Sequence, residues 1–194
     1  MELGGFANCI SLTSITIPNS VSTIEDNAFE GCSALTSIRI PNSVTEIGGY
    51  AFCNCTSLQE AELSDSISEI GNRLFSNTLL LSIKIPSNVV SIGYEAFYGT
   101  RLSEVLLPPS VKDIGSQAFA GNTNISKVVS LNTIPPEIDT TAFDAEVEEQ
   151  ARCMFRRDVW FFIGSTLYGK SLPIFPMIFF VYRLSRKLLM ETMR

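Results

Sequence analysis

A phenylalanine recurs at nearly constant intervals along most of this chain. Successive copies are 23, 23, 23, 22, 22 and 24 residues apart, at Phe6, Phe29, Phe52, Phe75, Phe97, Phe119 and Phe143. A fixed period in the twenties is typical of a solenoid, in which each unit is one coil that cannot bury its apolar face alone. The period therefore predicts a stack of coils rather than a single globular core.

Five further columns keep the same period and carry aliphatic residues, Ala61 being the exception among the substitutions. In the unit Ala28–Tyr50 these columns are represented by Leu35, Ile38, Ile40, Val44 and Ile47. Stacked coils bury such columns as continuous ladders, and each Å² of apolar area removed from water contributes about 25 cal/mol. We expect most of the stability to come from these ladders.

The order of residue types within one unit predicts its local shape. Ile38-Arg39-Ile40 alternates apolar and polar residues, as in a short half-buried strand, and Pro41 ends it because proline donates no ladder hydrogen bond. Asn42-Ser43 is turn chemistry, and Val44 to Gly49 suits an irregular or single-turn helical segment. Each coil is expected to have one short parallel strand on one side and a turn-rich arc on the other.

The spacing Leu35-x-x-Ile38-x-Ile40 resembles a leucine-rich repeat. The whole unit is similar to the BspA-like leucine-rich repeats, with their LxxIxIPxSVxxIGxxAFxxC signature, over about residues 5 to 143. The resemblance implies an α/β leucine-rich-repeat solenoid over residues 1–144, with a short parallel strand per 22–24-residue coil. It also implies a secreted or surface-displayed adhesion protein that binds extracellular proteins or other cells.

Charge is unevenly distributed along the sequence, whose net charge is −6. Residues 1–149 contain 6 Lys and Arg against 18 Asp and Glu, whereas residues 150–194 contain 8 against 2. The acidic repeat region offers no basic stripe to neutralise phosphates, so we expect no nucleic-acid partner.

The residue types needed for catalysis are largely missing. The sequence has no histidine, which removes Ser-His and Cys-His nucleophiles and most zinc catalysis. No glycine run makes a phosphate loop. Glu60 and Glu62 would lie on one face of a strand, but scattered surface acids are usual in repeats and no pocket is implied. We expect a non-catalytic protein without a cofactor.

Cys9, Cys32 and Cys55 lie one period apart, three residues after a phenylalanine. They are either metal ligands or disulfide partners, or a column of small buried residues. Cys53-x-Cys55 has no second pair at zinc spacing, and threonine replaces cysteine in later copies. The buried column is favoured, and all three thiols are then expected to be shielded from solvent.

The outward strand positions are the candidate binding residues, on what we expect to be the concave face. Parallel strands about 4.8 Å apart bring neighbouring rungs together. The charges of Arg39, Glu62 and Lys84 should then alternate, and Glu104 should face Lys127. The face is either a solvated sheet with paired charges or a recognition surface. The candidates are Thr16, Arg39, Glu60, Glu62, Lys84, Glu104, Leu106 and Lys127.

Residues 145–194 form a tail that lacks the repeat. Ala145 to Arg157 has good helix formers, an acidic start and arginines at its end, so we expect a capping helix and no further strand. Residues 159–182 are mostly apolar and long enough to span a membrane, but Lys170, Pro173 and Pro176 oppose a transmembrane helix. Membrane association and packing on the solenoid both remain open.

No signal peptide is evident, because Met1-Glu2 is not basic and no apolar region follows. We expect a fragment of a longer reading frame, with a cytosolic protein as the alternative. The most favoured function is a protein-binding module of a surface or secreted protein. A structural stalk within a longer surface protein and an intracellular interaction scaffold are the alternatives. The sequence does not indicate an oligomeric state.

Overall fold

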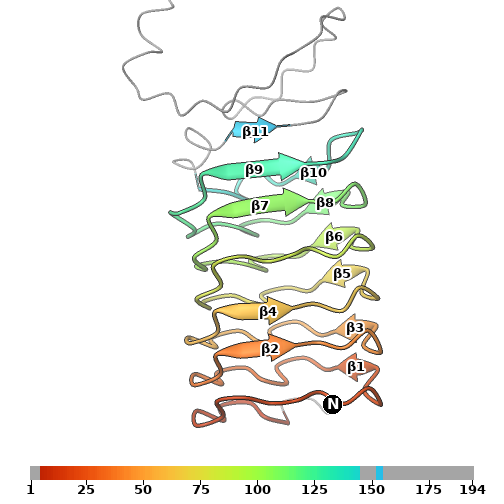
Figure 1. Ribbon diagram of the computed structural model, residues 1–194. Coiled ribbons are helices and arrows are strands. Elements are labelled where there is room, and N and C mark those ends of the chain that lie inside the picture. Colours follow the sequence, from red (N-terminus) through yellow and green to blue (C-terminus); the bar gives the residue numbers. More distant parts are fainter. Residues whose placement is uncertain (1–4, 145–151, 155–194) are drawn as a thin grey trace, which may run out of the picture.

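The computed structural model describes residues 5–144 and 152–154. The chain winds into coils that stack along one axis, with the N-terminal coil at one end (Figure 1). Every pair of hydrogen-bonded strands is parallel, which confirms the predicted solenoid with short parallel strands. Across these residues the chain forms no helix.

The strands predicted from the Ile-x-Ile pattern lie on one side of the stack. They are β2 (Ser37–Arg39), β4 (Glu60–Glu62), β7 (Glu104–Leu107) and β9 (Lys127–Ser130), joined by β11 (Arg152–Met154). β2 pairs with β4, and β9 pairs with both β7 and β11. Residues 14–17 and 82–85 occupy the same place in the first and fourth coils but are not assigned to strands. The sheet is therefore interrupted at the fourth coil.

The arcs contain a second set of two-residue strands that the sequence did not predict. They are β1 (Thr23–Ile24), β3 (Glu46–Ile47), β5 (Glu69–Ile70), β6 (Ser91–Ile92), β8 (Asp113–Ile114) and β10 (Glu137–Ile138). They run opposite to the strands of the other side (Figure 1). β1 pairs with β3, and the other four form one sheet in the order β5-β6-β8-β10.

Backbone hydrogen bonding explains why the arc forms strands instead of a helical turn. The amide of Gly48 donates to the carbonyl of Ile24 in the preceding coil, and Gly93 donates to Ile70, both at 2.8 Å. A helical turn would direct these amides to carbonyls four residues earlier in the same coil. Stacking therefore satisfies the backbone between coils.

The recurring phenylalanines form one continuous stack through the core. Neighbouring ring centroids are 5.0 to 5.8 Å apart and the rings are inclined by 3° to 13°. The five inner rings are fully buried, at Phe29, Phe52, Phe75, Phe97 and Phe119. Large buried rings contribute strongly to a core, and these rings also fix the alignment of successive coils.

The cysteine column is buried in part. Cys32 and Cys55 are buried, and their thiols donate to the carbonyls of Phe6 and Phe29 at 3.1 and 3.2 Å. The prediction is wrong for Cys9, which is exposed. Cys9 belongs to the first coil, which has a neighbouring coil on only one side within the described part of the chain.

The end of the stack also differs from the prediction. β11 pairs with β9, with Arg152 beside Lys127 and Met154 beside Val129. The expected helix over 145–157 is therefore wrong for residues 152–154, and a further strand does follow the last repeat. The open edge of β9 explains the difference, because its backbone groups gain partners only from another extended segment.

The remainder of the tail, including the apolar segment 159–182, lies outside the described residues. The boundary at residue 144 and the membrane association of the tail stay predictions. The residues that the structure describes include no helix long and apolar enough to cross a membrane.

Candidate functional site

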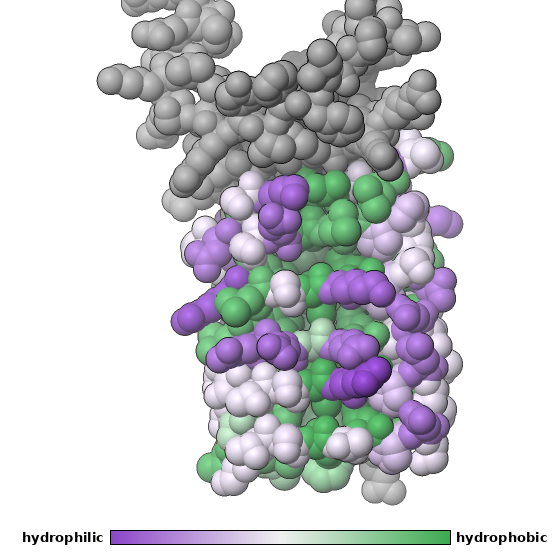
Figure 2. Space-filling model, viewed as in Figure 1, coloured by the Kyte–Doolittle hydropathy of each residue, from purple (hydrophilic) through white to green (hydrophobic). Residues whose placement is uncertain are grey.

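The outward side chains of β2, β4, β7 and β9 form what we call the strand face. Within β2, Ile38 is buried while Ser37 and Arg39 on either side of it are exposed. The same alternation places Glu104 and Leu106 of β7 outward. Figure 2 shows this side of the molecule, where hydrophilic and hydrophobic side chains are both present. The inward and outward assignment made from the sequence is confirmed for these strands.

Two of the expected ion pairs form across neighbouring strands. Arg39 Nε lies 3.2 Å from Glu62 Oε2, and Lys127 Nζ lies 3.1 Å from Glu104 Oε2. Each pair joins residues that are in register. The Arg39 and Glu62 side chains are 80% and 66% exposed, and exposed pairs contribute only about 0–1 kcal/mol. These pairs therefore determine how the charges are arranged on the strand face more than they stabilise the fold.

The other charged candidates do not join these pairs. The alternation of charges predicted that Lys84 pairs with Glu62, but this pair does not form. The Nζ of Lys84 instead lies 3.6 Å from Asp65 Oδ1. The interruption of the sheet at the fourth coil explains this, since no ladder holds Lys84 in register with Glu62. Thr16 and Glu60 are exposed, and Glu60 forms no ion pair among the residues described.

An apolar pair interrupts the polar character of the strand face. Leu106 is 53% exposed and lies in register with Val129, which is half-buried. The same column is polar in the first four coils, with Thr16, Arg39, Glu62 and Lys84. Leu106 points away from the core, so core packing does not account for its apolar character.

A cluster of aromatic and charged residues on the arc was missed by sequence reasoning. The guanidinium of Arg73 lies 5.6 Å from the ring centre of Tyr50 and 5.4 Å from that of Tyr94. Its Nε is 2.7 Å from a carboxylate oxygen of Glu95, whose side chain is 9% exposed. This contact raises the pKa of Arg73 above its ordinary value, so the guanidinium stays positively charged. The sequence did hold a signal for this cluster, because Tyr50 and Arg73 both lie two residues before a repeat phenylalanine and so occupy equivalent places in neighbouring coils.

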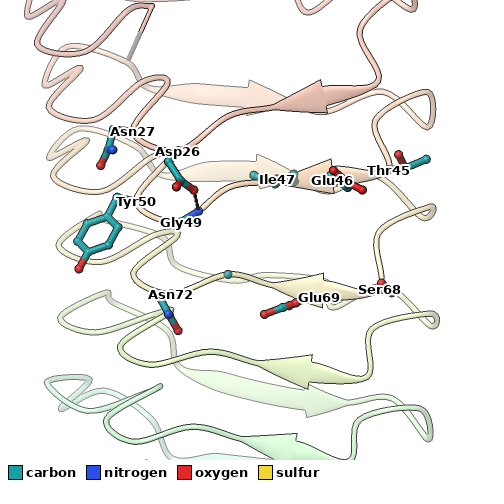
Figure 3. A pocket seen from close by; sticks show the side chains of 11 residues that line it. Asp26, Asn27, Thr45, Glu46, Ile47, Gly49, Tyr50, Ser68, Glu69 and Asn72 are labelled. Atoms are coloured by element: carbon teal, nitrogen blue, oxygen red, sulfur yellow. Dashed lines mark hydrogen bonds between the residues drawn. The ribbon is translucent and has the colours of Figure 1, made fainter. Parts of the chain in front are cut away.

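A hollow of about 570 Å³ opens beside this cluster, between β3 and β5. The arc sheet is interrupted there, because β3 pairs with β1 and β5 pairs with β6. Gly49 contributes to the space, since Asp26 and Asn72 at the equivalent positions carry side chains (Figure 3). Asp26 accepts a hydrogen bond from the amide of Gly49 at 2.7 Å, and Asn72 accepts one from Tyr94 at 2.8 Å.

The lining of the hollow is rich in hydrogen-bond acceptors. Its carboxylates come from Asp26, Glu46 and Glu69, and Tyr50 supplies an aromatic edge. Such a surface can accept hydrogen bonds from a donor group. Within residues 5–144 and 152–154, no group of three or more His, Cys, Asp or Glu is placed to hold a metal ion.

The chain belongs to a known repeat family. The model of the BspA type leucine-rich repeat region matches residues 2–144 in six copies. This match defines the class of the protein and confirms the family inferred from the repeat signature. No curated protein matches the chain.

Three solved structures of bacterial leucine-rich repeat proteins are similar. One, from Bacteroides ovatus, is 29% identical with a TM-score of 0.53, over 61% of this chain and 41% of its own. A leucine-rich cell surface protein from Faecalibacterium prausnitzii is 27% identical with a TM-score of 0.50, over 66% and 41%. The leucine-rich repeat protein of T. pallidum is 33% identical with a TM-score of 0.50, over 60% and 55%.

This chain therefore matches about half or less of the length of these relatives. Family and neighbours support a repeat module of the kind that binds proteins and is generally non-catalytic.

Proposed function

We propose that this chain is a protein-binding module and that the strand face is its recognition surface. The observation that carries the proposal is the apolar pair of the exposed Leu106 and the half-buried Val129, set among ion-paired charged residues on a sheet. Protein interfaces commonly combine an apolar centre with a polar rim. Repeat proteins bind along such extended surfaces, and the backbone bonds between coils hold this one rigid.

We further propose that the module works at the cell surface or after secretion, in adhesion to extracellular proteins or other cells. The description of the Faecalibacterium prausnitzii relative as a cell surface protein supports this location. The acidic repeat region makes nucleic acid an unsuitable partner. A stalk within a longer surface protein and an intracellular scaffold are the alternatives to this function.

Binding of the full chain to two panels of purified proteins, one extracellular and one intracellular, tests the proposal. The strand-face variant carries Arg39→Glu, Lys84→Glu and Leu106→Glu, and the matched arc variant carries Thr45→Glu, Ser68→Glu and Val90→Glu. We expect the full chain to bind at least one extracellular protein. The strand-face variant should lose about tenfold or more in affinity, while the arc variant should bind normally.

Other results would favour other functions. Loss of binding only in the arc variant would move the recognition surface to the hollow and the Tyr50–Arg73–Tyr94 cluster. Binding confined to the intracellular panel would favour the scaffold. If the chain binds no protein of the extracellular panel and none of the intracellular panel, the stalk is favoured.

A further inference from the structure

The fourth coil is bound to its neighbours differently on its two sides. On the strand side, residues 81–85 form no backbone hydrogen bond with the third or the fifth coil, within the part of the chain that the structure describes. Strand β4 of the third coil pairs with β2, and β7 of the fifth coil pairs with β9, so neither closes this break (Figure 1). The break is crossed by an exposed ion pair and an exposed hydrogen bond, in which Lys84 and Asn88 reach Asp65.

On the arc side the same coil is bound in both directions. Strand β6 pairs with β5 of the third coil and with β8 of the fifth. At the phenylalanine corner, the amides of Arg73 and Phe75 donate to the carbonyls of Tyr94 and Ala96, both at 2.8 Å. The ion pair of Arg73 with Glu95 adds a side-chain link between the third and fourth coils.

The phenylalanine stack gives an independent sign that the third and fourth coils diverge. The rings of Phe75 and Phe97 have centroids 5.8 Å apart and are inclined by 13°, and both values are the largest of the six neighbouring pairs. Phe75 belongs to the third coil and Phe97 to the fourth. The widest and most inclined step of the stack therefore lies beside the break on the strand side.

The core beneath the break is also the least closely packed part of its ladder. In this column Ile38 and Val105 are 4% and 1% exposed, whereas Ala61 and Ile83 between them are only half-buried. Ala61 is the one short residue in the column, so it leaves Ile83 with less apolar surface to pack against. Less apolar area is then removed from water where the third and fourth coils meet.

We propose that the fourth coil is a hinge, at which the strand side of the solenoid opens and closes while the arc and the phenylalanine corner stay bonded. Opening at this coil breaks no backbone hydrogen bond on the strand side, whereas opening between β2 and β4 or between β7 and β9 breaks a ladder. Local opening occurs where a segment has few buried apolar contacts and few backbone bonds to its neighbours.

The hinge would set the shape of the strand face. The Arg39–Glu62 pair lies before the hinge and the Glu104–Lys127 pair lies after it, so opening changes the distance between the two pairs. A partner that contacts both pairs would hold one distance and close the range of motion. Only this consequence rests on the proposed function, since the hinge is a property of the chain alone and is tested without any partner.

Hydrogen exchange of the full chain, read by mass spectrometry of its peptides, tests the hinge. We expect residues 82–85 to exchange about tenfold or more faster than residues 90–93, which lie on the arc of the same coil and form backbone bonds with the neighbouring coils. Urea below the unfolding transition separates hinge motion from unfolding, because the response to urea scales with the surface exposed. Exchange at 82–85 should respond little to urea, while exchange at β9 should accelerate.

Ile83→Val and Ile92→Val form a matched pair, because they make the same change on the two sides of one coil. Ile92 is 1% exposed on the arc, and its substitution should lower the urea midpoint clearly more than that of the half-buried Ile83. Equal exchange at 82–85 and 90–93, whether both are fast or both are slow, would overturn the hinge. So would equal shifts of the urea midpoint in the two variants. If the hinge is found but the chain binds no protein of either panel, the hinge stands and the proposed function fails.

Discussion

The thiol of Cys55 donates a hydrogen bond to the carbonyl of Phe29, 3.2 Å away and one coil earlier. Cys55 is fully buried, and burial raises the pKa of its thiol to about 12. In the next coil Thr78 takes this position and donates to the carbonyl of Phe75 at 2.9 Å. Both positions therefore hold a small buried donor, although Cys55 donates to the preceding coil and Thr78 donates within its own coil.

The first prediction concerns the dependence of stability on pH. Below the ordinary thiol pKa of 9.0, Cys55 is protonated in both the folded and the unfolded chain. As pH rises from 9.0 toward about 12, the unfolded chain loses this proton first, so the free energy of unfolding falls. One group contributes a slope of up to about 1.4 kcal/mol per pH unit in that window.

Cys55→Thr should remove this contribution, because threonine supplies the donor and does not ionise. Urea unfolding of both proteins between neutral pH and pH 11 measures the difference. The variant should lose less stability than the unmodified chain as pH rises above 9.0. Parallel losses in the two proteins would mean that the Cys55 thiol is not shielded as described.

Thiol labelling tests the corrected view of the cysteine column. Cys9 is exposed and should react with a thiol reagent in the folded protein, while Cys32, Cys53 and Cys55 are buried and should react only after unfolding. Burial is the main cause that raises the pKa of each of the three buried thiols, which further slows their reaction. Mass spectrometry of labelled peptides identifies the sites. Rapid modification of Cys55 in the native chain would contradict the buried column.

Ile40→Asp and Arg39→Ser compare adjacent inward and outward positions of one coil. Ile40 is 2% exposed, and an unpaired carboxylate there should cost several kcal/mol and disrupt the stack. The Arg39 side chain is 80% exposed, so its replacement should cost less than about 1 kcal/mol despite the loss of the Glu62 pair. Urea unfolding measures both. Similar losses of stability would refute the assignment of faces.

The repeat period was sufficient to predict the solenoid, because every coil must bury the same columns. Leu35, Val44 and Phe52 are fully buried, as their periodic spacing requires. The arc strands were not predictable in the same way. A two-residue strand such as β3 has no alternation long enough to detect, and it exists because Glu46 and Ile47 meet β1 in the neighbouring coil.

The end of the solenoid shows a second limit of local reasoning. Residues 145–157 have helix-forming composition, yet Arg152–Met154 extends along β9. Helix propensity is a weak preference, and an adjacent open strand edge is a tertiary feature that composition does not contain.

The side-chain contacts of the strand face were predicted correctly where the sheet is regular and wrongly where it is interrupted. Arg39 meets Glu62 because register places them side by side. Lys84 turns to Asp65 because its coil lacks that ladder. The contact of Arg73 with Tyr50 and Tyr94 depends on how three coils overlap on the arc, which the spacing of one repeat does not specify.

Gly48→Ala and Gly49→Ala should have unequal effects, although the two glycines are adjacent. A Cβ at Gly48 would overlap the backbone nitrogen and the side-chain oxygen of Asp26 in the preceding coil. The coils would have to separate, at a cost of about 1–3 kcal/mol. A Cβ at Gly49 meets nothing closer than the Asn72 carbonyl at 3.2 Å, so the cost should stay below about 1 kcal/mol. Thermal unfolding compares the stability of the two variants. An equal loss of stability in both would contradict the close contact between Gly48 and Asp26 of the preceding coil.

The last prediction concerns β11 as the cover of the solenoid. A chain ending after Gln150 lacks β11, whereas a chain ending after Phe155 keeps it. The shorter chain leaves the backbone edge of β9 without its partner, and each backbone hydrogen bond lost contributes about 0.5–1.5 kcal/mol. We therefore expect the chain ending after Phe155 to unfold at a higher urea concentration. Hydrogen exchange should show slower exchange of the β9 amides in that chain. Equal stability and equal exchange in the two chains would mean that β11 does not hold the end of the stack.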